Sequence, residues 1–302
     1  NSKKNENDDE IDIFQTSQES SFVILRAFPD IDEITSSSLS LLALTAKSDS
    51  VRKRHLLQED RGDRYNITLP IGIMKSSLER TKKKEHPGDC DYDNDYEEQL
   101  AAEVQRKACI YLGALSDGNA QLASQIVQNS GLESILACID WFRCHLHVVN
   151  WALWAVFNLC FDHVGNKCEF VRLDGIGKVC RSMRNILEEE KAESARDGHG
   201  SNGSDCNDSD YLEVARHGIA LFFYLLRYDP SSYGKSSNNL KLDFVHVRRV
   251  ALNAGLHEIL TVSMTKFPRD MQVMMMGQQM LIATGYNGEI PPFQGEIVRK
   301  WN

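Results

Sequence analysis

The sequence has no uncharged apolar run of the roughly 18 residues that a membrane-spanning helix needs. It has no excess of positive charge either, because 34 Lys and Arg residues stand against 43 Asp and Glu residues, for a formal net charge of -9. A protein-wide basic surface for nucleic acid is therefore absent. The first ten residues, NSKKNENDDE, also lack the apolar core of a secretory signal. We expect neither membrane insertion nor nucleic-acid binding.

Catalytic and metal-binding motifs are missing as well. The chain contains no G-x-S-x-G, no P-loop, no G-x-G-x-x-G and no H-E-x-x-H. Its eight cysteines show neither a disulfide framework nor the paired spacing of zinc ligands. The acidic run DCDYDNDYEE lacks the central Gly and the terminal Glu of an EF-hand. We therefore expect no catalytic residue, metal or cofactor, and a reducing compartment, the cytoplasm or alternatively the nucleus.

Helical periodicity is what the sequence does contain, and it recurs. Three amphipathic helices follow a Gly that we expect to take the positive φ of a sharp corner. These glycines are Gly131, Gly175 and Gly255. Longer helices repeat a small residue that would let a neighbouring helix approach closely. These residues are Ala108, Ala152, Gly218 and Gly277. Ala108 and Ala152 are 44 residues apart, as are Gly131 and Gly175, and a helical period in the low forties is typical of armadillo and HEAT arrays.

The run from Asn119 to Asp162 resembles one complete armadillo repeat. NAQLASQIVQNSG resembles its short first helix and Gly corner, LESILACIDWF its second helix, and VVNWALWAVFNLC its long third helix. The resemblance implies an all-α fold, a right-handed α-solenoid of about four to five armadillo-like three-helix repeats over residues 22–286. HEAT repeats remain the alternative, above all for the terminal repeats.

Polar segments interrupt and flank these repeats. We expect residues 1–21 to be disordered and residues 287–302 to form a tail or to begin a further element. Inserted loops are predicted near 82–97, 187–210 and 230–241, where Ser, Gly, Asp and Lys accumulate. The chain begins without Met and ends on EIVRKWN, which is consistent with a recognition domain from a larger multidomain protein or enzyme.

The apolar helix WALWAVFNLCFD contains one pair with a specific resemblance. Trp154 and Asn158 have the spacing of the Trp and Asn pair with which importin-α-like receptors hold an extended peptide. Two interpretations stay open, because a buried amide must find a partner: Asn158 bonds a bound peptide, or it bonds a neighbouring helix. The resemblance further implies that the third helices line a concave groove. Its predicted residues are Lys107, Trp151, Trp154, Asn158, His217, Tyr224 and Gln279.

These residues predict a non-catalytic scaffold or adaptor that binds a protein partner. Aromatic side chains with basic groups and amides have the composition of interface hot spots. The groove is mildly basic, so we expect an extended and somewhat acidic segment as its ligand. A cargo receptor of the nuclear-transport type is the alternative. Such a receptor repeats the Trp and Asn pair along its array, whereas this chain has the pair once.

Overall fold

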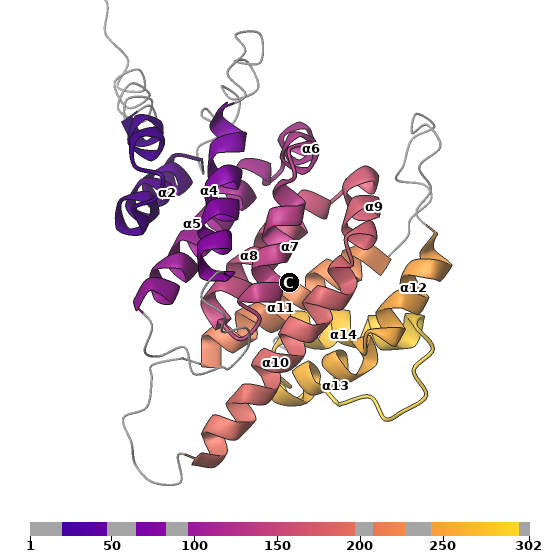
Figure 1. Ribbon diagram of the computed structural model, residues 1–302. Coiled ribbons are helices and arrows are strands. Elements are labelled where there is room, and N and C mark those ends of the chain that lie inside the picture. The colour runs from indigo at the N-terminus through magenta and orange to yellow at the C-terminus, as the bar shows by residue number, and fades with distance from the viewer. Residues whose placement is uncertain (1–19, 47–64, 83–95, 197–207, 227–242, 296–302) are drawn as a thin grey trace, which may run out of the picture. The chain divides into compact units, whose positions relative to one another are not determined.

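Every regular element in the described part of the chain is a helix, which confirms the all-α class. The computed structural model describes residues 20–46, 65–82, 96–196, 208–226 and 243–295 (Figure 1). After a helix at residues 20–27 come α2 (Asp32–Ala46), α4 (Tyr65–Lys82), α5 (Tyr96–Ser116), α6 (Ala120–Gln128), α7 (Gly131–Trp141), α8 (Leu146–Cys160), α9 (Val164–Arg172), α10 (Gly175–Arg196), α11 (Asp208–Leu226), α12 (Phe244–Asn253), α13 (Leu256–Lys266) and α14 (Met271–Ala283). Within these ranges, no helix is both long and apolar enough to cross a membrane.

The chain forms two compact units. The first comprises residues 1–142 with 154–159, and its central helix is α5, which packs against α2, α4, α6 and α7. Every residue of α5 from Ala108 to Ser116 is buried. A helix that is buried on all its faces must be surrounded by other elements, which is the position of α5. Tyr111 of α5 is fully buried and meets Phe22 of the 20–27 helix edge-on, with ring centroids 6.5 Å apart.

The second unit comprises residues 143–153 with 160–302. Its helix α10 packs against α9, α11, α12 and α13, and α11 packs against α14 (Figure 1). The apolar side of α10 supplies Ile176, Val179, Met183 and Ile186, all of them buried. This spacing of three and four residues is the stripe that a helix needs to bury one face.

A trio of helices recurs along the chain. The trios are α6–α7–α8, α9–α10–α11 and α12–α13–α14, and each begins with a helix of 9 or 10 residues. The second trio begins 44 residues after the first, at Val164 compared with Ala120, which is the period of the sequence pattern. In the second unit, equivalent helices of successive trios pack together, α10 with α13 and α11 with α14.

The first helix of each trio begins with a side-chain cap. Asn119 Oδ1 accepts a hydrogen bond from the Leu122 amide of α6 at 3.0 Å. His163 Nδ1 accepts from the Asn166 amide of α9 at 3.1 Å. Asp243 Oδ1 accepts from two amides of α12, at 3.0 and 3.1 Å. Each cap satisfies an amide that the helix itself leaves without an acceptor.

The glycine corners differ in part from the prediction. Gly255 has φ 89°, as expected, but at the other two corners the preceding residues take the positive φ, 64° at Ser130 and 55° at Asp174. Glycine is needed at positions 131 and 175 because neighbouring atoms leave no room for a Cβ. A Cβ on Gly131 would lie 2.8 Å from the Ile126 carbonyl oxygen, and one on Gly175 would lie 2.7 Å from the Phe170 oxygen. The corner therefore needs Gly for close approach at these two sites.

The small residues of the third helices do permit close packing. A Cβ on Gly218 of α11 would overlap the side chain of Met183 in α10. A Cβ on Gly277 of α14 would lie 2.7 Å from the sulfur of Met264 in α13. In both trios, a methionine side chain of the second helix packs directly against the glycine of the third helix. The small residue recurs because a large side chain occupies the space beside it.

One predicted loop is wrong in part. Helix α10 continues to Arg196 and α11 begins at Asp208, so residues 187–196 and 208–210 are helical. The reason is that EEEKAESAR consists mainly of Glu, Lys and Ala, which are strong helix formers despite their polarity. Residues 197–207 lie outside the described part of the chain, as do 1–19, most of the predicted 82–97 loop and all of the 230–241 loop. Residues 287–295 of the predicted tail form no regular helix.

Candidate functional site

Asn158, the amide in the apolar helix, bonds a neighbouring helix. Its Nδ2 donates to the carbonyl oxygen of Gly113 in α5 at 3.2 Å, and the residue is only 9% exposed. That carbonyl also accepts from the Asp117 amide, just beyond the end of α5, and from the Ser116 hydroxyl, each at 3.0 Å. Of the two interpretations of Asn158, the structure shows the contact between helices. One of its two donors is already used in packing.

Trp154 lies against the same glycine. A Cβ on Gly113 would overlap two carbons of the Trp154 ring, one of them 2.6 Å away, and would lie 3.1 Å from the Ala155 Cα. The α5 backbone is therefore in direct contact with the indole, which is half-buried. Trp154 and Asn158 belong to the first unit, whereas Trp151, also half-buried, belongs to the second.

Lys107 is the predicted groove residue of α5, and it shares an acid with Arg106. Arg106 donates twice to Glu103, at 2.6 Å to each carboxylate oxygen, and Lys107 Nζ lies 3.5 Å from Glu103 Oε1. The hydrogen bonds from Arg106 are the main reason that the pKa of Glu103 is lowered. Two cations with one carboxylate leave this part of α5 with a local positive charge.

His217 of α11 is held by an amide from α8. Its Nδ1 lies 2.8 Å from Asn150 Oδ1, and since an amide oxygen only accepts, Nδ1 carries the proton. Burial lowers the pKa of His217, an effect that nearby Glu213 opposes. The ring is therefore neutral at pH 7, with Nε2 3.9 Å from a Glu213 oxygen.

A second polar contact joins α11 to the start of α14. Arg216 Nη2 and Nε donate to Asp270 Oδ2 at 2.6 and 3.1 Å, and Nη1 donates to Glu213 at 2.6 Å. Asp270 is also the N-cap of α14, with Oδ1 accepting from the Val273 amide at 2.8 Å. In the second unit, polar contacts therefore join each third helix to the next. Asn150 joins α8 to α11, and Asp270 joins α11 to α14.

Tyr224 lies in the last turn of α11. Its ring stands edge-on to Phe161 and Phe223, with centroids 4.9 and 5.4 Å away. Its backbone oxygen accepts from Lys167 Nζ at 3.0 Å. A lysine at this place satisfies one of the carbonyls left over at a helix end and lies favourably in the helix dipole.

Gln279 of α14 is exposed, and it lies on the helix between two exposed apolar side chains. Met275 is 52% exposed and Ile282 is 68% exposed. The adjacent Gln278 donates to the Pro291 carbonyl at 3.1 Å.

The seven predicted groove residues are divided between the two units. The first unit contains Lys107, Trp154 and Asn158, and the second contains Trp151, His217, Tyr224 and Gln279.

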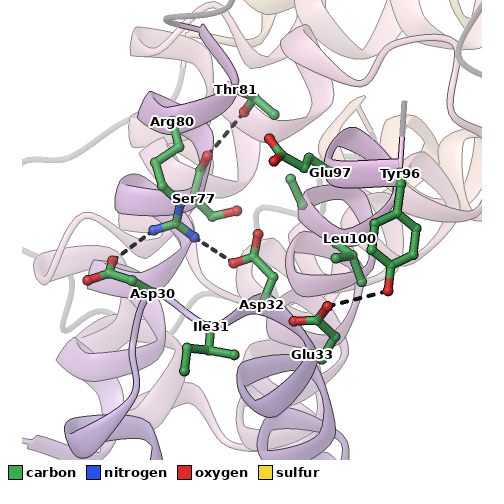
Figure 2. A pocket seen from close by; sticks show the side chains of 11 residues that line it. Asp30, Ile31, Asp32, Glu33, Ser77, Arg80, Thr81, Tyr96, Glu97 and Leu100 are labelled. Atoms are coloured by element: carbon green, nitrogen blue, oxygen red, sulfur yellow. Dashed lines mark hydrogen bonds and ion pairs between the residues drawn. The ribbon is translucent and has the colours of Figure 1, made fainter. Parts of the chain in front are cut away.

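The first unit also contains a pocket that the sequence pattern does not predict. It has a volume of about 470 Å³ and lies between the start of α2, the second half of α4 and the start of α5 (Figure 2). We call it the α2–α4–α5 pocket. Its lining residues are Asp30, Ile31, Asp32, Glu33, Ser77, Arg80, Thr81, Tyr96, Glu97, Leu100 and Ala101.

Arg80 organises the polar side of this pocket. Its guanidinium lies 2.9 Å from Asp30 Oδ1 and 2.5 Å from Asp32 Oδ1 (Figure 2). Across the pocket, the Tyr96 hydroxyl donates to Glu33 at 3.3 Å. Burial raises the pKa of Asp32, and the adjacent Arg80 opposes the rise. The available sequence signal was the acidic PDIDEI, but Arg80 is 48 residues further on, so the pattern alone did not join them.

The cysteines and acids of the described residues form no metal centre. No group of three or more His, Cys, Asp or Glu side chains in those ranges is arranged to hold a metal ion. None of the described cysteines forms a disulfide. Burial raises the pKa of Cys160 and of Cys180 to about 12, so both remain protonated at pH 7.

Comparison with known proteins adds no assignment, since no protein-family model, no curated protein and no solved structure matches the chain.

Proposed function

We propose that this chain is a non-catalytic scaffold or adaptor with armadillo-like repeats, which binds an extended segment of a partner protein along its third helices. The all-α class and the recurring helix trio support the architecture. Repeats of this kind expose a long surface in place of a deep cavity, which suits a partner that is itself extended.

One observation carries the proposal, the series of third helices in the second unit. Asn150 of α8 meets His217 of α11, and Arg216 of α11 meets Asp270 at the start of α14. These contacts fix the order of the helices that would line a groove. Trp151 and Tyr224 lie on the same helices, α8 and α11, and both are half-buried.

The chemistry of this surface favours aromatic and amide recognition. Trp and Tyr give large contact areas at a low cost in conformational entropy, and they are enriched in interface hot spots. The expected preference for an acidic partner comes from a different place, α5 of the first unit, where Arg106 and Lys107 share Glu103. By contrast, Arg216 is neutralised by Glu213 and Asp270 and adds no free positive charge.

The importin-like alternative gains no support from the described residues. In that alternative, the Asn158 amide binds the backbone of a peptide. Here its Nδ2 donates to Gly113, which is a contact that packs α8 onto α5. We therefore propose the scaffold function alone, in the cytoplasm or the nucleus.

Selection from a library of random extended peptides tests the proposal directly. We expect the wild-type chain to enrich peptides that combine acidic with apolar residues. Trp151→Ala should weaken their binding about tenfold or more, because hot-spot aromatics contribute about 2 kcal/mol or more. Val245→Ala is the control, since Val245 is 74% exposed but lies on the first helix of a trio.

Circular dichroism of each variant first establishes that its helices are retained. If folded Trp151→Ala binds the selected peptides as tightly as the wild type, the third helices are not the binding surface. If basic peptides are enriched, the expected charge preference is wrong. If no peptide is selected at all, the scaffold proposal fails for extended ligands.

A further inference from the structure

We propose that the α2–α4–α5 pocket binds an organic cation, an ammonium or guanidinium group carried on an aliphatic stem. This site lies in the first unit and is independent of the third-helix surface proposed above. The argument depends on the charge of the lining, on one buried hydroxyl and on the apolar wall of the pocket.

The charge of the lining disfavours an anionic ligand. Among the described residues, four carboxylates, those of Asp30, Asp32, Glu33 and Glu97, line the pocket together with one cation, Arg80. Arg80 is already held by Asp30 and Asp32, so it offers no uncompensated charge to a phosphate or a carboxylate. A second cation, in contrast, would enter a field that remains negative.

Ser77 is the independent sign of a ligand. It is fully buried, lines the pocket, and its hydroxyl oxygen has no hydrogen-bond partner. Figure 2 shows this side chain pointing towards the space bordered by Leu100 and Glu97. A buried hydroxyl without a partner costs roughly 1–3 kcal/mol, and such groups are rare in native proteins. An N–H donor on a bound cation would supply the missing partner.

Apolar groups in the same lining suit the stem of such a ligand. Ile31, Leu100 and Ala101 contribute aliphatic side chains, and Tyr96 contributes an aromatic ring. Lysine and arginine stems pack on such surfaces while their charged ends reach polar groups. A volume of about 470 Å³ lies within the range of small-molecule sites and exceeds what one such group requires.

A metal ion does not fit the same lining. Three of the carboxylates belong to residues 30–33 and the fourth, that of Glu97, belongs to α5, and no three acidic, His or Cys groups of the described residues converge as metal ligands do. An organic cation does not need convergence, because its several N–H donors point in different directions. The pKa of Asp32 agrees with this, because burial raises it by more than the charge of Arg80 lowers it.

Calorimetric titration of the full chain at low salt tests the site with two probes. Agmatine carries an ammonium and a guanidinium on a butyl stem, and acetyl-Gly-Arg-Gly-amide carries the same guanidinium on a peptide. We expect saturable binding that weakens as salt is added. Tighter binding of agmatine identifies a free amine as the source of the cation, and tighter binding of the peptide identifies a protein side chain.

Three variants locate the binding. Glu97→Gln and Ser77→Ala should each weaken it about tenfold, because hydrogen bonds to charged groups contribute about 1.5–3 kcal/mol. Glu133→Gln removes one exposed carboxylate of the same unit outside the pocket and should leave the affinity unchanged. Ser77→Ala should melt no lower than the wild type, because it removes a hydroxyl that makes no hydrogen bond.

The proposal is overturned if neither probe binds saturably to the wild-type chain. It is also overturned if Glu133→Gln weakens binding as much as Glu97→Gln does, because the attraction would then come from net charge alone. Saturable binding of inorganic phosphate that Ser77→Ala abolishes would show that the pocket takes anions instead.

Discussion

Replacement of Gly113 by Ala should destabilise the first unit, although alanine is the better helix former. Gly113 lies inside α5, where the Trp154 ring occupies the place that a Cβ would take. The Ala155 backbone is 3.1 Å from the same point, so moving the indole alone does not relieve the contact. Two opposing effects therefore decide the sign.

The steric effect is the larger of the two. Overpacking of a core costs about 1–3 kcal/mol, whereas a change from Gly to Ala in a helix gains about 1 kcal/mol. A displaced α8 also weakens the hydrogen bond from Asn158 to the Gly113 oxygen, which contributes about 0.5–1.5 kcal/mol. The net expectation is a loss of about 1–3 kcal/mol in the free energy of unfolding.

Gly72→Ala is the matched control. Gly72 is also inside a helix of the first unit, but no atom lies within 4 Å of its added Cβ, and the residue is exposed. It should stabilise the unit by about 1 kcal/mol. Urea unfolding followed by circular dichroism and tryptophan fluorescence measures both variants. If Gly113→Ala also stabilises the chain, α5 and α8 do not make this close contact.

Other predictions follow from single side chains. Asp270→Asn keeps an acceptor for the α14 cap but loses the Arg216 ion pair, whereas Asp270→Ala loses both. In urea unfolding, Ala should therefore cost about 1 kcal/mol more than Asn, and equal costs would contradict the cap. Burial lowers the pKa of His217, so the native state binds fewer protons than the unfolded chain. Stability should thus fall as pH drops below about 6.5, and His217→Gln should remove that part of the slope. Burial also lowers the pKa of Lys266 to about 8, so limited acetylation at pH 8 should modify it ahead of ordinary exposed lysines, as peptide mapping would show.

The helical class and the trio spacing were predictable because their causes are local. Apolar residues at spacings of three and four give the helices, and the Gly corners and small residues recur at the spacing of the trios. The helical extension of α10 does not follow from polarity, because a charged segment can be either a loop or an exposed helix. Glu, Lys and Ala favour helix through the backbone, whatever their polarity.

The polar contacts of the candidate sites were not predictable from local patterns. The partner of Asn158 is 45 residues away, and its identity depends on how α8 and α5 pack. The α2–α4–α5 pocket likewise draws on three separate parts of the chain, so its charges appear in the sequence as unrelated runs. The residue types predicted an interaction surface. Tertiary packing determines which of these side chains instead form contacts within the protein, as Asn158 does.

The three caps of the trios give the array an unequal tolerance of acid. The side-chain oxygens of Asn119 and Asp243 accept hydrogen bonds in every protonation state of those side chains. His163 accepts through Nδ1, which protonation converts into a donor, and burial lowers the pKa of this ring. Its cap is therefore present at neutral pH and lost as pH falls below the lowered value. Mild acid should loosen the start of α9 first, visible as faster hydrogen exchange there than in α6 or α12 once the intrinsic pH dependence of exchange is removed.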